Sequence, residues 1–317
     1  MSDGFPPASE AIVICTRNRP GELRQTLTSI SEHPPSGDAA LVVVDASDPE
    51  ARTENRETLV SVQAIPSVHW PYTDTPSSAR QRNVALDRLP PSVNIVHFLD
   101  DDVTVHAGYF DDLTRTLQAH PNVGGVGGRI HQPEAPPSPA TWPQRLFLLS
   151  SAQDGVVLSS GCAESAQLSD ASADAPSSSP ISTEWLSGCS CTYRWEVLRR
   201  HRFAASMDGY ALLEDLEFSY RVGQDTALLA VPEATLTHRV STQNRHNLSE
   251  YVYTAMVHRY WLVTTTLTPN AGTLPFWWAF VGEILACTSH PQGSSKLRGL
   301  ARAVKTLLTR DHPLLSS

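Results

Sequence analysis

One stretch constrains the fold more than any other: an apolar run that stops abruptly at three carboxylates. Residues 95–99 are rich in β-forming side chains, and Asp100, Asp101 and Asp102 follow them directly. In open α/β sheets, ligands bind beyond the carboxyl ends of the strands. Three adjacent acids repel one another unless a positive charge lies among them, and hard divalent cations prefer carboxylate oxygens. The stretch favours a strand that ends at a metal site; a solvated acidic turn is the alternative for the triplet alone.

The segments around this stretch alternate between strand and helix patterns. Continuous apolar runs predict strands at 11–16, 41–44, 68–70 and 95–99, and a glycine-rich strand at 123–130. Helical patterns fall between them, at 20–30, 51–62, 76–89 and 109–120. Strands that alternate with helices form βαβ units, so we predict an α/β fold with a mainly parallel sheet flanked by helices.

The composition excludes several functions. The net charge of −9 over 317 residues argues against nucleic-acid binding, which needs a basic face. Lysine occurs only at Lys296 and Lys305, so a phosphate-binding loop with its lysine is absent. No apolar run reaches the roughly 18 residues of a membrane span, and the first ten residues do not resemble a signal peptide. Five cysteines without framework spacing fit a reducing cytoplasm.

Four short segments in this order resemble the family 2 glycosyltransferases, which have the GT-A fold. They are residues 12–19, 42–47, 78–83 and 98–102, and the resemblance covers about residues 11–265. It implies that Thr16 and Asp45 hold the base of a nucleotide-sugar and that Asp100 contacts its ribose. Asp101 would be mostly structural. The full set implied to bind the donor is Thr16, Arg17, Asp45, Arg80, Asn83, Asp100, Asp101 and Gly188.

The resemblance also implies a metal site and a catalytic base. Asp102, the last acid of the D-x-D, would ligate Mn²⁺ or Mg²⁺ together with His238, which ends a P-x-A-x-x-x-H spacing. Residues 210–221 have one apolar helical stripe and resemble the family's E-D-x-[DE]-[FL]-x-x-R segment. Asp215 would be the base and Glu214 the fallback. Two ordinary first-turn acids are the alternative, since a helix N-terminus favours carboxylates.

We divide the chain into a disordered tail at 1–10, a glycosyltransferase domain at 11–247 and a C-terminal helical extension at 248–317. Within the domain, 11–130 would bind the donor, 131–183 would be a variable loop, and 184–247 would form the acceptor and catalytic half. The Ser/Ala/Pro/Asp tract at 159–182 is typical of a mobile or partly disordered loop. The extension has an aromatic stretch followed by a basic helix, and a membrane surface, a second copy and the domain itself remain open as its partner.

These observations predict a metal-dependent, inverting glycosyltransferase. The donor would be a UDP-, dTDP- or GDP-linked sugar, and the acceptor an unknown hydroxyl compound, with a lipid-linked one among the options. The location would be cytoplasmic, with peripheral contact at the inner face of the membrane as a variant. A dehalogenase-type phosphatase is disfavoured, because it needs a lysine upstream of Lys296. A catalytically inactive nucleotide-sugar-binding module of the same fold stays open.

Overall fold

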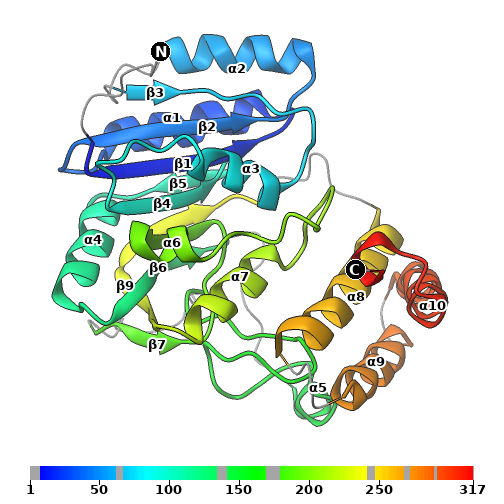
Figure 1. Cartoon of the computed structure of the whole chain (residues 1–317). Coiled ribbons are helices and arrows are strands. Elements are labelled where there is room, and N and C mark those ends of the chain that lie inside the picture. The colour runs from blue at the N-terminus through cyan, green and yellow to red at the C-terminus, as the bar shows by residue number, and fades with distance from the viewer. Residues whose placement is uncertain are drawn as a thin grey trace.

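The computed structural model describes residues 8–61, 67–133, 141–168, 179–240, 247–267, 272–288 and 291–316. A single twisted sheet runs through the molecule, with helices on both of its faces and a group of helices at one end (Figure 1). This is the mixed α/β architecture expected from the alternating sequence pattern.

The first half of the sheet is parallel. β1 (Glu10–Thr16) pairs with β2 (Ala39–Asp45) and with β4 (Ile95–Asp100), and β3 (Ser67–His69) lies beyond β2. All these strands therefore place their carboxyl ends at the same edge, as βαβ units require. Thr16 lies opposite Asp45, and Cys15 lies opposite Asp100, so three strand ends meet there.

The second half is mixed, which limits the prediction of a mainly parallel sheet to the first half. β8 (Ser190–Arg194) is antiparallel to both β4 and β6 (Val123–His131), because it enters the sheet from the opposite end. β6 is parallel to β9 (Ala227–His238). Two short strands, β5 (Val103–Val105) and β7 (Ile181–Thr183), run antiparallel to β9.

Two apolar cores cover the two faces of the sheet. Alternate residues of β1 enter different cores: Ile12 and Ile14 pack on one side, Ala11 and Val13 on the other. The first side is covered by α1 (Pro20–Glu32), α2 (Pro49–Ser61) and α4 (Tyr109–Ala119). The opposite side is covered by α3 (Ser78–Leu86), α6 (Trp195–Arg200) and α7 (Glu214–Gly223). Apolar runs without polar alternation are what a sheet buried on both faces requires.

The segment between β6 and β8 is more ordered than its composition predicts. It contains α5 (Trp142–Leu146), and Gln167 is buried, with its Nε2 donating to the carbonyls of Gly128 (3.0 Å) and Ser190 (2.7 Å). Residues 159–168 and 179–182 of the tract predicted to be mobile are therefore part of the packed structure. Residues 8–10 of the tail predicted to be disordered are ordered, since Ala8 is buried and β1 begins at Glu10. Residues 169–178 and 1–7 lie outside the described residues, so that part of each prediction is untested.

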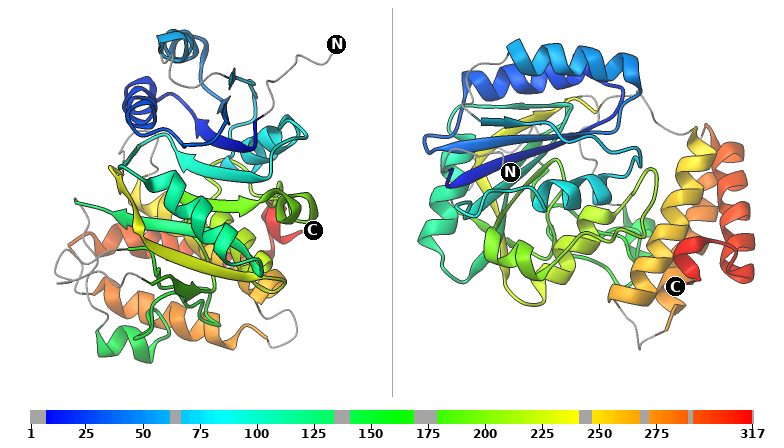
Figure 2. Two further views of the ribbon diagram at one scale, coloured as in Figure 1. Left: turned by 90° about the vertical axis from the view of Figure 1, so that its left-hand side faces the viewer. Right: turned by 45° about the horizontal axis from the view of Figure 1, so that its top comes forward.

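The C-terminal extension consists of α8 (Leu248–Leu262), a π-helical turn at Val263–Leu267, α9 (Leu274–Cys287), α10 (Gly293–Thr309) and a short 3₁₀ turn at Pro313–Leu315. These helices share a third apolar core and pack side by side (Figure 2). The extension also contacts the domain, since His258 Nδ1 donates to the Leu212 carbonyl at 2.9 Å. Among the described residues, no helix combines the length and apolar character needed to cross a bilayer.

Candidate active site

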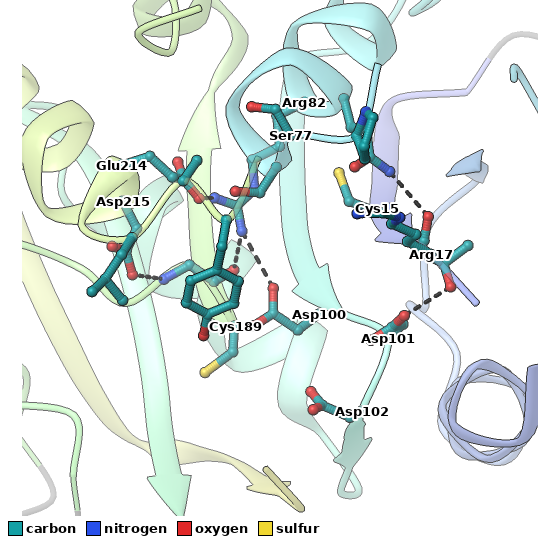
Figure 3. A pocket seen from close by; sticks show the side chains of 18 of the residues that line it. Cys15, Arg17, Ser77, Arg82, Asp100, Asp101, Asp102, Cys189, Glu214 and Asp215 are labelled. Carbon is teal, nitrogen blue, oxygen red and sulfur yellow. Dashed lines mark hydrogen bonds and ion pairs between the residues drawn. The ribbon is translucent and has the colours of Figure 1, made fainter. Parts of the chain in front are cut away.

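The strand ends converge on a cavity of about 430 Å³ (Figure 3). Its walls come from the ends of β1, β4 and β9, from α3, and from the loop that leads into α7. Of the residues predicted to act in the reaction or to bind the donor or metal, it brings together Thr16, Arg17, Asp100, Asp101, Asp102, Gly188, Glu214, Asp215 and His238. These residues are as far as 222 positions apart (238 − 16), so only the fold could show their proximity.

The middle acid of the triplet is bound by the protein itself. Asp101 is buried; its Oδ2 accepts from the Thr16 hydroxyl at 2.7 Å, and its Oδ1 from the Arg19 guanidinium at 3.0 Å. Burial raises the pKa of Asp101 to about 7; Arg19 opposes this shift and Asp102 adds to it. Asp101 therefore holds the turn between β4 and β5 and leaves the two outer acids to face the cavity.

The two outer acids and His238 form a candidate metal centre. One donor atom from each of Asp100, Asp102 and His238 lies within 4.8 Å of the others. His238 Nε2 is 3.1 Å from Asp102 Oδ1. Pairing of β5 with β9 places His238 opposite Val103, the residue after Asp102. Two carboxylates and an imidazole suit Mn²⁺, and Mg²⁺ less specifically, so the donor set fits the predicted ion.

The electrostatics of this cluster favour a cation. Burial lowers the pKa of His238, but the neighbouring Cys189 thiol and the carboxylates of Asp102 and Asp100 outweigh it and raise that pKa to about 11. The surrounding groups therefore attract positive charge to this position. Gln132 Nε2 lies 3.2 Å from His238 Nδ1, the ring nitrogen opposite the one that faces Asp102.

Arg82 is the buried cation between the candidate metal centre and the start of α7. Its guanidinium pairs with Glu214, lies 3.3 Å from Asp100 Oδ1 and donates to the Gly188 carbonyl at 3.1 Å. Burial lowers the pKa of Arg82, but Glu214 and Asp100 hold it well above its ordinary value. A Cβ atom on Gly188 would lie 2.6 Å from the Arg82 guanidinium, so a larger residue here would have to displace the end of that side chain.

Glu214 and Asp215 have different environments despite being neighbours. The backbone at Leu213 is left-handed (φ 70°), so α7 begins at Glu214 rather than at the start of the predicted 210–221 helix. Glu214 is buried, and burial raises its pKa to about 7; Arg82 opposes this and Asp215 adds to it. Asp215 is half-buried and its Oδ2 accepts from the Gly188 backbone N–H at 2.8 Å. Of the two, Asp215 is the carboxylate presented to a ligand.

Three residues implied by the family resemblance do not line the cavity. Asp45 has no exposed surface, and its carboxylate accepts from Ser47 N, Asn55 Nδ2 and Trp70 Nε1. Arg80 Nε pairs with Asp208 at 2.7 Å, away from the acids. The amide of Asn83 bonds to both the carbonyl and the N–H of Phe203. In this structure these three side chains bond within the protein, and the roles that the resemblance implies for them in donor binding stay predictions.

Sequence reasoning gave no site role to Arg19, Arg82, Gln132 and Gln167. The role of Arg82 could have been inferred from the sequence, because Arg82 shares the apolar face of α3 with Ala79, Ala85 and Leu86. A buried arginine requires partners, so its position on that face points to buried acids. The role of Gln167 could not have been inferred, because this residue lies in a tract whose composition is typical of disordered segments.

No model of a protein family matches this sequence, and no curated protein matches it. Solved structures do match its fold. A mannosyltransferase, PcManGT from Pyrobaculum calidifontis, in complex with GDP-Man and Mn²⁺, aligns over 97% of this chain and 89% of its own, with 14% identity and a TM-score of 0.55. GalNAc-T7 with UDP, GalNAc and Mn²⁺ aligns over 98% of this chain but 59% of its own, with 12% identity and a TM-score of 0.57.

A third match is TarS 1–349 from S. aureus, with 13% identity, coverage of 96% of this chain and 92% of its own, and a TM-score of 0.52. At such low identity these matches establish the fold and leave the activity to be argued from the site. The chain has the GT-A fold of these glycosyltransferases, as the family resemblance implied.

Proposed function

We propose that this protein is a metal-dependent glycosyltransferase that moves a sugar from a nucleotide-diphosphate sugar to an acceptor hydroxyl. One observation carries the proposal: on a GT-A fold, the Asp100–Asp102–His238 cluster and the accessible Asp215 line the same cavity. The matched mannosyltransferase was solved with GDP-Man and Mn²⁺, and GalNAc-T7 with UDP, GalNAc and Mn²⁺, which supports this class of donor and ion.

Different residues of the cavity would bind the metal ion and remove the proton of the acceptor. Asp100, Asp102 and His238 would hold Mn²⁺ or Mg²⁺, and such an ion neutralises the charge that develops on a departing diphosphate. Asp215 takes the proton of the acceptor hydroxyl, whose oxygen attacks the anomeric carbon while the bond to the diphosphate breaks. A single displacement of this kind inverts the anomeric configuration.

Arg82 keeps Asp215 and its neighbour in separate roles. Because Arg82 pairs with Glu214, the Glu214 carboxylate is engaged inside the protein. A base must reach the proton that it removes; both carboxylates line the cavity, but Asp215 is half-buried whereas Glu214 is only 5% exposed. We therefore assign the base to Asp215, with Glu214 as a positioning residue that holds Arg82.

The test is nucleotide release from a panel of UDP-, dTDP- and GDP-sugars, with and without Mn²⁺. We expect slow, metal-dependent hydrolysis of one donor, which is lost in Asp102→Ala and in Asp215→Asn. Asp87→Asn is the matched control, because Asp87 is an exposed acid far from the cluster. If nucleotides bind without turnover in the presence of any acceptor tried, the inactive binding module becomes the better description.

We also propose a cytoplasmic location, since all five cysteines are unpaired thiols. Fractionation of cells that produce the protein checks this, and recovery in the membrane fraction would instead support the peripheral contact through the C-terminal helices. The apolar side chains that α9 exposes are the candidate for such contact: Leu274, Trp278, Val281, Ile284 and Leu285.

A further inference from the structure

A second cavity adjoins the candidate active site on the side of the C-terminal helices. Its volume is about 520 Å³, within the range of small-molecule sites. Leu212, Leu213 and Asp215 line this cavity and the active-site cavity alike. The carboxylate proposed to be the catalytic base therefore lies where the two cavities meet.

The extension builds one wall of this second cavity. One face of α8 lines the cavity, with side chains that recur every three or four residues: Leu248, Tyr251, Val252, Ala255, Met256 and Arg259. α9 and α10 add Cys287 and Leu300. The bond from His258 to the Leu212 carbonyl fixes α8 against the loop that leads into α7, the helix that carries Asp215. The wall is thus held in a defined position relative to the base.

The lining offers little for a polar ligand to bind. Besides Asp215, its charged side chains are Arg259, Glu283 and Lys296. Arg259 and Glu283 pair with each other at 3.4 Å, and the Arg259 guanidinium also contacts the Cys162 sulfur at 3.0 Å. Lys296 is half-buried. A carbohydrate chain here would leave many hydroxyl groups without partners, which is unfavourable, whereas an alkyl or aryl group would bury apolar surface.

We propose that this cavity binds the apolar body, alkyl or aryl, of the acceptor and directs its hydroxyl to Asp215. The inference rests on the proposed function and adds the substrate class. In the transfer, the hydroxyl proton goes to Asp215, the acceptor oxygen bonds to the anomeric carbon, and the bond to the diphosphate breaks, so that the nucleoside diphosphate leaves.

The first experiment measures binding without any turnover. The neutral probe N-phenyl-1-naphthylamine is titrated by fluorescence into the wild type and Ala255→Phe, which fills the cavity from α8. Ala301→Phe is the matched control, because Ala301 is exposed on α10 and does not line the cavity. We expect saturable binding that weakens by at least about tenfold in Ala255→Phe and is retained in the control. Equal binding in all three proteins, or none in the wild type, would overturn the proposal.

Displacement then identifies the apolar group. Octyl, phenyl and methyl β-D-glucosides compete with the probe, the octyl compound below its micellar concentration. Displacement by octyl alone indicates an alkyl acceptor, and displacement by phenyl alone an aryl one; methyl glucoside displacing the probe as well as the others would overturn the apolar assignment.

A last measurement links the cavity to the reaction. With donor and Mn²⁺ present, the displacing compound should change the rate of donor consumption, with a midpoint that matches its dissociation constant. Such a compound is either glycosylated or keeps water away from Asp215. A bound compound that leaves donor consumption unchanged would overturn the acceptor role. Absence of any donor turnover, with probe binding intact, would count against the proposed function and leave the cavity as a ligand site.

Discussion

Two strands of the parallel half, β2 and β4, both end at carboxylates, and the fold surrounds these ends differently. At the end of β2, Asp45 accepts hydrogen bonds from Ser47 N (2.7 Å), Asn55 (3.0 Å) and Trp70 (3.2 Å) and has no exposed surface. Three neutral donors thus occupy most of the roughly four acceptor sites of this carboxylate. A buried carboxylate bonded in this way contributes to stability.

At the end of β4, more negative charge is gathered than the nearby positive groups compensate. Three carboxylates follow one another, and the protein supplies two arginines: Arg19 lies 3.0 Å from Asp101 and 3.6 Å from Asp102, and Arg82 is shared between Asp100 and Glu214. Asp102 also lies against His238, whose pKa the cluster raises to about 11. Negative charge is therefore concentrated toward the cavity. An acid at the end of a strand thus becomes a candidate ligand where the surrounding groups leave negative charge that a bound cation can compensate.

The strongest test of this contrast is Asp102→Asn. Removing one ligand of the cluster should lower metal-dependent donor turnover by about 100-fold or more, since a metal contributes several kcal/mol to the transition state. The Mn²⁺-induced rise in Tm should disappear as well. A thermal shift by Mn²⁺ that survives in Asp102→Asn would remove Asp102 from the ligand set.

Asp45→Ala should behave in the opposite way. The substitution removes the acceptor of the Ser47 backbone N–H and of Trp70 Nε1–H, and one of the two acceptors of Asn55 Nδ2. A donor left unsatisfied costs about 1–3 kcal/mol, so the free energy of unfolding should fall by roughly 2–5 kcal/mol. The affinity for Mn²⁺, measured by calorimetry on the folded protein, should be retained. If instead stability is unchanged and nucleotide binding weakens, Asp45 contacts the base as the family resemblance implies.

Glu214→Gln should change how the stability of the protein depends on pH. The pKa of Glu214 rises from 4.5 to about 7 on folding. Its favourable contribution is thus complete below about pH 4.5 and is lost as the pH rises through about 7. Urea unfolding at about pH 5 and about pH 8 should show a smaller loss of stability in Glu214→Gln than in the wild type. Asp101 also has a raised pKa, so the loss should shrink without vanishing. An unchanged pH dependence would contradict this assignment.

The smallest effect is expected for Arg80→Ala. Arg80 pairs with Asp208 through side chains that are 39% and 63% exposed, and exposed ion pairs contribute about 0–1 kcal/mol. Neither Tm nor the KM for the donor should change appreciably. A clear rise in KM for the donor with unchanged Tm would place Arg80 at the diphosphate. The binding of the donor would then extend beyond the acids at the end of β4.

The sequence allowed the fold and much of the site to be predicted. Apolar strands that alternate with helices require a sheet buried on both faces, and this predicted β1, β2 and β4 within a few residues. Carboxylates directly after β4 predicted where the site lies, because the ends of parallel strands meet at one edge. The P-x-A-x-x-x-H spacing singled out His238, which lies within the cluster.

The roles of individual side chains were less accessible. Arg80, Arg82 and Asn83 lie on one helix, yet Arg82 alone lines the cavity, since a turn of about 100° per residue sends neighbours to different sides. The order within 159–168 also escaped prediction, because it depends on contacts such as those of Gln167 with Gly128 and Ser190, which are distant in the chain.

By itself, the sequence determined the class of fold and the edge of the sheet at which the acids gather, since periodicity and strand ends are local properties. The tertiary structure alone decided which acids face a ligand: β5 had to pair with β9 to bring His238 to Asp102, and α3 had to pack against α7 to engage Glu214 with Arg82. It also decided that α8 lies beside Asp215 and encloses a second cavity. A carboxylate's role depends on the charges and donors around it, and those come from parts of the chain that only folding brings together.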